Sequence, residues 1–239
     1  MVVSHASNVI GLISPVEKLC SMAKKYKAVT VIDLAQTAGL VDLNVGLETI
    51  DFAVFAGHKT LYGPTGISGF AMKPDFDLKP VLFGGTGFES ANQDMPNDIP
   101  QRYEMGTLNI VGIAGLYASS GWILDEEMDC LWEHEQSKRK ELLKILRSYD
   151  FVKIIGDNEN NQYIGIVSCV INGLPSDTAA SVFAEKNIAV RSGLQCAPLA
   201  HKTLGTFPSG TIRFSCSAFT SDADFADLEQ ALEWIKGNI

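Results

Sequence analysis

The sequence predicts an α/β fold in two parts, and two observations support that prediction. Apolar runs at residues 52–55 and 67–72 are continuous rather than alternating, which is typical of strands covered on both faces. Helix signals, which are polar caps followed by apolar residues at helical spacing, precede and follow these runs. We expect a large α/β domain over residues 1–125 and a small α+β domain over residues 126–239.

In the first part, the chain opens on a strand and then enters a helix that runs to about residue 26. Ser14 is expected to cap this helix, with Pro15 at its first position and Glu17 in its first turn. A strand that ends at Asp33 follows. Residues 84–106 are rich in Gly, Asn, Asp and Pro. A loop of this length usually has a functional reason, so we expect it to frame the active site.

The first part is expected to end with a helix that begins at Asn109 and ends near residue 125. The second part is predicted to combine helices with strands, and Ser176 is expected to cap one of its helices. The last helix carries Leu228 and Leu232 on one face, as core packing requires. The elements expected after residue 126 are a helix over 128–149, a strand over 164–171, a helix over 176–186, a strand over 211–217 and a helix over 222–236.

Composition excludes several classes of function. The chain has 239 residues, of which 46% are hydrophobic and 20% charged, as in ordinary globular proteins. Its net charge of -9 argues against nucleic-acid binding, which requires a basic face. No apolar run approaches the ~20 residues of a membrane span, and no signal peptide or metal-ligand cluster is evident. Five cysteines without paired spacing fit the reducing cytoplasm.

Lys59 is the first candidate for chemistry, because it follows the apolar run 52–55 and precedes a turn that begins at Tyr62. A lysine at the carboxyl end of a buried strand is expected to be partly desolvated, which favours the neutral amine that condenses with carbonyl groups. A solvated lysine in a surface loop fits the same local sequence. Both interpretations are open at this stage.

Asp33 also ends an apolar strand. The carboxyl ends of strands line the ligand crevice of an open α/β sheet, so Asp33 and Lys59 could face one site. Pyridoxal phosphate needs such a pair, because its aldehyde reacts with a lysine and its ring nitrogen pairs with a carboxylate. Asp33 fits equally well as a helix N-cap.

Cys196 lies in a loop between Gly193 and Pro198 and is flanked by Arg191 and His201. Cationic neighbours stabilise a thiolate, which is the nucleophilic form of cysteine. The other four cysteines lie in apolar helical or strand-like contexts. Cys196 is therefore a candidate nucleophile, with an inert thiol as the alternative.

Six segments, taken in order, resemble signature segments of the class V aminotransferase family, and most closely its cysteine desulfurase and selenocysteine lyase branch. The resemblance runs along the whole chain. It implies the aspartate-aminotransferase-like fold (fold type I), with a partial pyridoxal-phosphate-binding large domain and a small carboxyl-terminal domain. The segments are SNVIG at 7–11, DLAQ at 33–36, GHK at 57–59 with YGP at 62–64, EMGT at 104–107, RSGLQC at 191–196 and TIRFS at 211–215.

The resemblance implies five contacts with pyridoxal phosphate. Lys59 would condense with the aldehyde and later act as the base. Asp33 would pair with the pyridine nitrogen, and Gln36 would hydrogen-bond the phenolic oxygen. His58 would contact the phosphate, and Thr107 would reach the phosphate of the neighbouring subunit in a homodimer.

For the substrate, the resemblance implies three further roles. Asn8 would lie near both the phenolic oxygen and the substrate, and Arg213 would bind the substrate carboxylate, which suits a planar guanidinium. Cys196 would accept sulfur as L-cysteine becomes L-alanine, and a sulfur-acceptor protein could then take it. The alternatives are a selenocysteine lyase, another class V aminotransferase that needs no catalytic thiol, or an inactive fragment or interaction module.

Three departures from the family pattern stand out. Ala56 occupies a position where a Ser or Thr hydroxyl commonly binds phosphate, and Gln195 replaces a common His before the catalytic cysteine. Full-length members also carry a segment before the strand that opens this chain, with a phosphate-cradling turn and a stacking histidine. We therefore expect this chain to be the carboxyl-terminal part of such an enzyme, and His5 to be a strand or loop residue.

Overall fold

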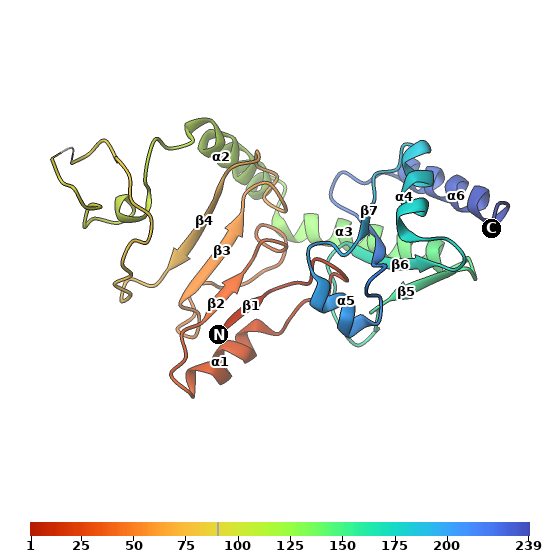
Figure 1. Cartoon of the computed structure of the whole chain (residues 1–239), viewed down its shortest axis with the longest axis horizontal. Coiled ribbons are helices and arrows are strands. Elements are labelled where there is room, and N and C mark those ends of the chain that lie inside the picture. Colours follow the sequence, from red (N-terminus) through yellow and green to blue (C-terminus); the bar gives the residue numbers. More distant parts are fainter. Residues whose placement is uncertain (90) are drawn as a thin grey trace.

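Two four-stranded sheets organise the chain in the computed structural model, which describes residues 1–89 and 91–239 (Figure 1). The first sheet has the order β1-β2-β3-β4. Its first three strands are parallel, and β4 runs antiparallel to β3. The strands of this sheet are β1 (Val2–Ser4), β2 (Val31–Asp33), β3 (Phe52–Ala56) and β4 (Ser68–Met72).

The helix α1 (Val16–Lys24) connects β1 to β2 and packs on this sheet. Its buried Val16 and Cys20 belong to one apolar cluster with Ile32 of β2. The expected start of the helix was wrong by one residue, because Pro15 occupies the cap position rather than the first helical position. Proline suits both places, since it has no backbone N–H to satisfy.

The expectation of strands covered on both faces is wrong for β4. Phe52 and Ala53 of β3 are buried, but β4 forms the edge of the sheet and Phe70 is 45% exposed. The loop over residues 84–106 contains only the short 3-10 helix η1 (Gln101–Tyr103), apart from residue 90, which lies outside the described residues. It extends beyond β4 and away from the second sheet, so it does not frame a site between the sheets (Figure 1).

Two helices lead from the first sheet to the second (Figure 1). They are α2 (Ile110–Asp125) and α3 (Met128–Arg147), so α3 ends two residues before its expected end. Asn109 caps α2 as predicted, because its side-chain oxygen accepts a 2.9 Å hydrogen bond from the Gly112 N–H. Its side-chain nitrogen also donates to the Gly66 carbonyl oxygen, which ties the helix to the loop before β4.

Replacing Asn109 by Ala should lower the free energy of unfolding by about 1 kcal/mol, because the first turn of α2 loses its side-chain acceptor. Urea unfolding followed by circular dichroism measures this change. Asn109→Ser keeps an acceptor and should recover most of the loss. Equal stability of the Ala and Ser variants would contradict the capping role.

The second sheet is wholly antiparallel and has the order β5-β6-β8-β7. Helices α4 and α6 pack with it, and the short α5 lies beside β7 (Figure 1). The bounds of these elements are β5 (Val152–Ile155), β6 (Ile166–Ile171), α4 (Ser176–Glu185), β7 (Arg191–Gly193), α5 (Pro198–Leu204), β8 (Thr211–Ser215) and α6 (Asp222–Lys236).

The larger apolar core of the protein lies between this sheet and helices α3, α4 and α6. Phe183 of α4 is fully buried and meets Phe214 of β8 edge to face, with ring centroids 5.3 Å apart. Leu228 and Leu232 of α6 are buried as their spacing predicted. The extent of α6 was also predicted correctly.

Three short elements were missed, namely β5, β7 and α5, because three to seven residues carry too little periodicity to stand out from a loop. Ser176 does not cap α4, because Pro175 holds the cap position and the Ser176 hydroxyl donates to the Ser209 carbonyl oxygen. Among the described residues, no helix is both long and apolar enough to cross a membrane.

The segment after β1 connects the two sheets. Leu12 forms an isolated antiparallel bridge with Tyr163, and the Ser168 hydroxyl of β6 donates to the Val9 carbonyl oxygen. Ala6 shares an apolar cluster with Ile164. This segment belongs by sequence to the first part of the chain but makes contacts in the second. The division between residues 125 and 126 therefore stays a prediction.

Candidate functional site

A cavity of about 160 Å³ lies where the two parts of the chain meet. Its walls bring together three of the residues proposed from the sequence, Gln36, Lys59 and Arg213. Gln36 and Lys59 come from the loops that follow β2 and β3, and Arg213 comes from β8. The other residues of the wall are Leu40, Thr60, Tyr62, Glu135, Ile164, Gly165, Ile166, Ser215, Cys216 and Ser217.

Asp33 stands at the carboxyl end of β2 and is half-buried. Its Oδ1 accepts a 2.8 Å hydrogen bond from the Ala35 N–H, which holds the turn that leads to Gln36. One carboxylate oxygen is therefore used locally, but the described residues between β2 and β3 form no helix, so the interpretation of Asp33 as a helix N-cap is wrong. No described residue donates a hydrogen bond to Oδ2, so the carboxylate keeps an oxygen for a ligand.

Lys59 lies three residues after the end of β3, and both it and His58 are exposed. The expected partial desolvation of Lys59 is therefore wrong. The reason is that β3 ends at Ala56 and the following turn carries the lysine out to the open side of the cavity. Lys59 nevertheless lies just after the end of β3 and lines the cavity, as expected of a residue at a strand end.

Arg213 is half-buried, and its Nη1 donates to the backbone carbonyl oxygen of Asn8 over 2.8 Å. Burial lowers its pKa, and so does the positive charge of Arg191, whereas the charge of Cys196 opposes the shift. Its buried Nε has no hydrogen-bond partner among the described residues, and neither does the buried Thr60 hydroxyl on the same wall. Unsatisfied buried polar atoms are rare, so this pair marks the cavity as a place for a polar ligand.

Asn8 joins Arg213 to the cysteine loop. Its backbone oxygen accepts from Arg213, and its side-chain nitrogen donates to the Gln195 carbonyl oxygen over 2.7 Å. Cys196 itself is exposed and is not part of the cavity wall. Asn8 contacts both Arg213 and the carbonyl oxygen of Gln195, the residue before Cys196, so the cysteine loop lies on the Arg213 side of the site.

The remaining cysteines differ from Cys196 in burial. Cys20, Cys169 and Cys216 are buried, and Cys130 is exposed on α3. Burial raises the pKa of Cys169 and of Cys216 to about 12, so both stay as thiols. In Cys216, the charge of Glu135 adds to this effect.

Thr107 lies apart from the cavity. It is exposed just before α2 and is not among the residues that line the cavity. Its predicted contact with a neighbouring subunit stays a prediction. His5 is buried and its Nδ1 lies 2.9 Å from the Thr37 hydroxyl oxygen, so it is a structural residue as expected.

Sequence reasoning missed two residues of the wall. Glu135 of α3 is 4% exposed, and burial raises its pKa to about 7, although a hydrogen bond from the Gly165 N–H opposes the rise. Tyr62 packs edge to face against Trp122 and Phe219. Glu135 lies four residues after the buried Leu131 on the same helix face, which was the available signal.

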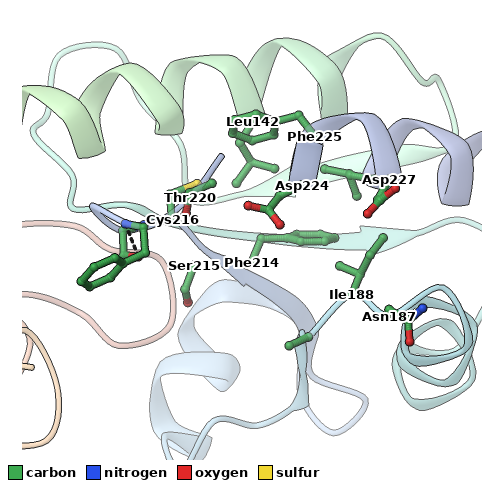
Figure 2. Close-up of a pocket in the computed structure, with 14 residues that line it drawn as sticks. Leu142, Asn187, Ile188, Phe214, Ser215, Cys216, Thr220, Asp224, Phe225 and Asp227 are labelled. Carbon is green, nitrogen blue, oxygen red and sulfur yellow. Dashed lines mark hydrogen bonds between the residues drawn. The ribbon is translucent and has the colours of Figure 1, made fainter. Parts of the chain in front are cut away.

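A larger cavity of about 320 Å³ lies on the other side of the end of β8 (Figure 2). Ser215, Cys216 and Ser217 line both cavities, so this short segment separates them. Phe214 and Phe225 form its apolar wall, and Asp224 and Asp227 project from α6 at its rim (Figure 2). None of the residues proposed for chemistry lines it.

The wall of the smaller cavity fits the ring and aldehyde of pyridoxal phosphate better than its phosphate. On this wall Lys59 offers an amine, Gln36 an amide and Thr60 an unpaired hydroxyl. Asp33 does not line the cavity, but it stands three residues before Gln36 at the end of β2 with one carboxylate oxygen available. For the phosphate, Ala56 offers no hydroxyl. No group of three or more His, Cys, Asp or Glu side chains within the described ranges is arranged to hold a metal ion.

A family model described as aminotransferase class-V matches residues 1–228 of the chain. Among curated proteins, a probable cysteine desulfurase of Methanothermobacter thermautotrophicus is 32% identical, with 98% of this chain and 60% of that protein covered. A probable cysteine desulfurase of Pyrococcus abyssi is 35% identical, with 92% of this chain and 55% of that protein covered. The chain thus spans a little over half the length of the curated relatives it matches.

Solved structures give the same result for the fold. The apo structure of a cysteine desulfurase from Thermococcus onnurineus superposes with a TM-score of 0.89 at 30% identity, covering 100% of this chain and 60% of that chain. A cysteine desulfurase from Escherichia coli superposes with a TM-score of 0.87 at 24% identity, covering 100% of this chain and 59% of that chain. The fold-type-I architecture predicted from the sequence is confirmed.

Proposed function

Because the chain belongs to the class V aminotransferase family, we propose that it performs the amino-acid-binding and sulfur-accepting part of a cysteine desulfurase. The reaction would convert L-cysteine to L-alanine and leave a persulfide on Cys196. The observation that supports this most is the junction of three groups: Lys59 and Arg213 line one cavity, and Asn8 ties Arg213 to the cysteine loop. Selenocysteine is the alternative substrate.

Arg213 would bind the substrate carboxylate. Its Nη1 is held by the Asn8 carbonyl oxygen, while its buried Nε has no partner and is available to a ligand oxygen. A guanidinium that is fixed on one side and free on the other gives a carboxylate a defined orientation. The substrate would therefore enter with its carboxylate towards β8.

Pyridoxal phosphate, when bound, would supply an electron sink that delocalises the negative charge formed at the amino-acid carbon. Lys59 would hold the cofactor through its amine and then move a proton at its Nζ. Asp33 would face the ring nitrogen with the oxygen that the Ala35 N–H leaves available, and Gln36 would bind the phenolic oxygen. His58, Asn8 and Thr107 are proposed for the phosphate and the substrate as the family resemblance implies.

The sulfur step follows from the place of Cys196. Its thiolate would attack the sulfur of the bound cysteine, forming an S–S bond while the carbon–sulfur bond breaks. The electron pair of the broken bond stays on carbon, which takes up a proton to give alanine. Overall, one thiol and L-cysteine become one persulfide and L-alanine, so no external oxidant or reductant is required.

The test is to incubate the protein with pyridoxal phosphate and L-cysteine and to measure alanine together with a mass increase of one sulfur on the Cys196 peptide. Cys196→Ala should lower alanine formation at least about 100-fold, because the sulfur-accepting nucleophile is lost. Cys130→Ala, which also removes an exposed thiol, should leave alanine formation unchanged. Alanine formation that survives Cys196→Ala would favour another class V activity, and preference for selenocysteine would favour a lyase.

We further infer that the protein forms a homodimer in the cytoplasm. Val111, Tyr117 and Leu124 of α2 are all about four-fifths exposed, at 82%, 83% and 79%, which is a large apolar area for one helix. Light scattering tests the dimer, and a monomer at micromolar concentration would contradict it.

The five free cysteines fit a reducing compartment such as the cytoplasm. In that compartment, an acceptor protein would take the persulfide sulfur.

A further inference from the structure

The residue that precedes Cys196 is fixed by side chains that the proposed sulfur transfer does not use. Gln195 is 4% exposed, and His201 is fully buried. His201 Nε2 lies 2.8 Å from Gln195 Oε1. The Gln195 Nε2 donates to the Thr211 carbonyl oxygen over 3.1 Å. Buried polar groups need hydrogen-bond partners. The Gln195 side chain finds both of its partners, Thr211 and His201, within the second sheet and its loops.

The partners also define the protonation of the histidine ring. A backbone carbonyl oxygen only accepts, so the Gln195 nitrogen must face Thr211 and its oxygen must face His201. His201 Nε2 therefore carries a proton and donates it to Gln195. Nδ1 then accepts from the Thr206 hydroxyl, 2.7 Å away. Burial lowers the pKa of His201, although a backbone contact at Leu194 opposes the shift, which agrees with a neutral ring.

This hydrogen-bonded pair supports an unusual backbone. Gln195 and Cys196 have φ values of +43° and +61°, so two consecutive residues other than glycine occupy the left-handed region. Such a conformation costs free energy and persists only where the surroundings hold it. The Asn8 amide holds the turn from one side through the Gln195 carbonyl oxygen, and His201 holds the Gln195 side chain from the other.

We propose that Gln195 and His201 are positioning residues, whose buried hydrogen bond holds the left-handed turn that presents the Cys196 thiol to solvent beside Arg213. In this view the glutamine is an anchor and takes no part in proton transfer. The role of this turn in sulfur transfer rests on the function proposed above. The test of the turn is independent of that function, because the reactivity of Cys196 can be measured without cofactor or substrate.

The test compares two thiols in the same folded chain. Cys130 is exposed like Cys196 but lies on α3, so it serves as an internal reference. The iodoacetamide alkylation rates of both are measured by peptide mass spectrometry. In Gln195→Ala, the ratio of the Cys196 rate to the Cys130 rate should fall about fivefold, because the left-handed turn relaxes and no longer holds the Cys196 sulfur in its exposed position.

His201→Ala should lower the same ratio by a similar factor, because Gln195 then loses its donor. Gln230→Ala is the matched control, since Gln230 is exposed on α6, away from both thiols in the sequence, and its loss should leave the ratio unchanged. Circular dichroism checks that each variant is folded. If folded Gln195→Ala and His201→Ala variants keep the native ratio, the proposal is wrong.

A second measurement uses the unmodified protein. It tests the hydrogen bond between His201 and Gln195 even if the substitutions prevent folding. The ¹⁵N NMR spectrum of the unmodified protein should show one imidazole N–H of His201 at Nε2, with exchange slower than that of the exposed His134. A His201 ring protonated at Nδ1 instead, or one that exchanges as fast as His134, would overturn the proposal.

Discussion

Lys59→Ala is expected to lower the turnover of L-cysteine by about 1,000-fold or more, because in the proposed function one amine on the cavity wall would both hold the cofactor and move the proton. Lys59→Arg should be equally inactive. Arginine keeps the positive charge, but its guanidinium does not deprotonate and cannot condense with an aldehyde. The comparison separates the chemistry of the amine from the electrostatics of the site. Alanine release from L-cysteine measures both variants.

Chemical labelling checks this prediction independently of turnover, and a second lysine serves as the control. Borohydride reduction in the presence of pyridoxal phosphate should attach the pyridoxyl group to Lys59, and peptide mass spectrometry locates it. Lys79→Ala removes an exposed lysine from the loop beyond β4 and should change neither turnover nor labelling. Labelling of a lysine other than Lys59, with Lys59 unmodified, would show that the assignment of the amine is wrong.

Glu135→Gln should increase the free energy of unfolding by about 3 kcal/mol at pH 8 and by almost nothing near pH 4. Burial raises the pKa of Glu135 from 4.5 to about 7. Below the lower value the carboxyl is protonated in both the folded and the unfolded chain. Between the two values only the unfolded chain ionises, so the wild-type protein loses stability as the pH rises, and above about 7 the loss is complete.

Glutamine removes this pH dependence and keeps an oxygen that accepts from the Gly165 N–H, a hydrogen bond of 2.6 Å in the wild type. The fit is close, since a Cβ at residue 165 would come within 2.6 Å of Glu135 Cγ. Urea unfolding from pH 4 to pH 9 measures the difference. Glu133→Gln, on the exposed side of the same helix, is the matched control. Parallel stability curves for Glu135→Gln and wild type would contradict the prediction.

The sequence predicted the parts of the fold that depend on local signals. Helix α2 begins at its Asn109 cap, and α6 begins and ends where its pattern does, because caps and helical spacing act over a few residues. Strand β7 has three residues and is a strand only because β8 pairs with it. Pairing of that kind depends on distant chain and leaves no local pattern.

In the candidate site, too, some residues could be predicted from the sequence and others depend on distant parts of the chain. Lys59 and Asp33 were recognised at strand ends, and family resemblance added Arg213, which local chemistry alone would not have placed on the same cavity. The helical spacing of Glu135 from Leu131 indicated which face it shares, but its hydrogen bond from the Gly165 N–H depends on distant chain and left no signal in the sequence. The sequence left the exposure of Lys59 open between two interpretations, because the turn after β3 decides it and the turn conformation is set by tertiary contacts.

The link through Asn8 has a consequence for the choice of substrate. Because Asn8 is hydrogen-bonded both to Arg213 and to the Gln195 carbonyl oxygen next to Cys196, the groups proposed to bind the carboxylate and to accept the sulfur are tied to one residue. With the proposed function, the site would select an amino acid by the distance from its carboxylate to its sulfur rather than by the shape of its side chain. L-Cysteine has one such distance, and a homologue with an added methylene would carry its sulfur past the Cys196 thiolate.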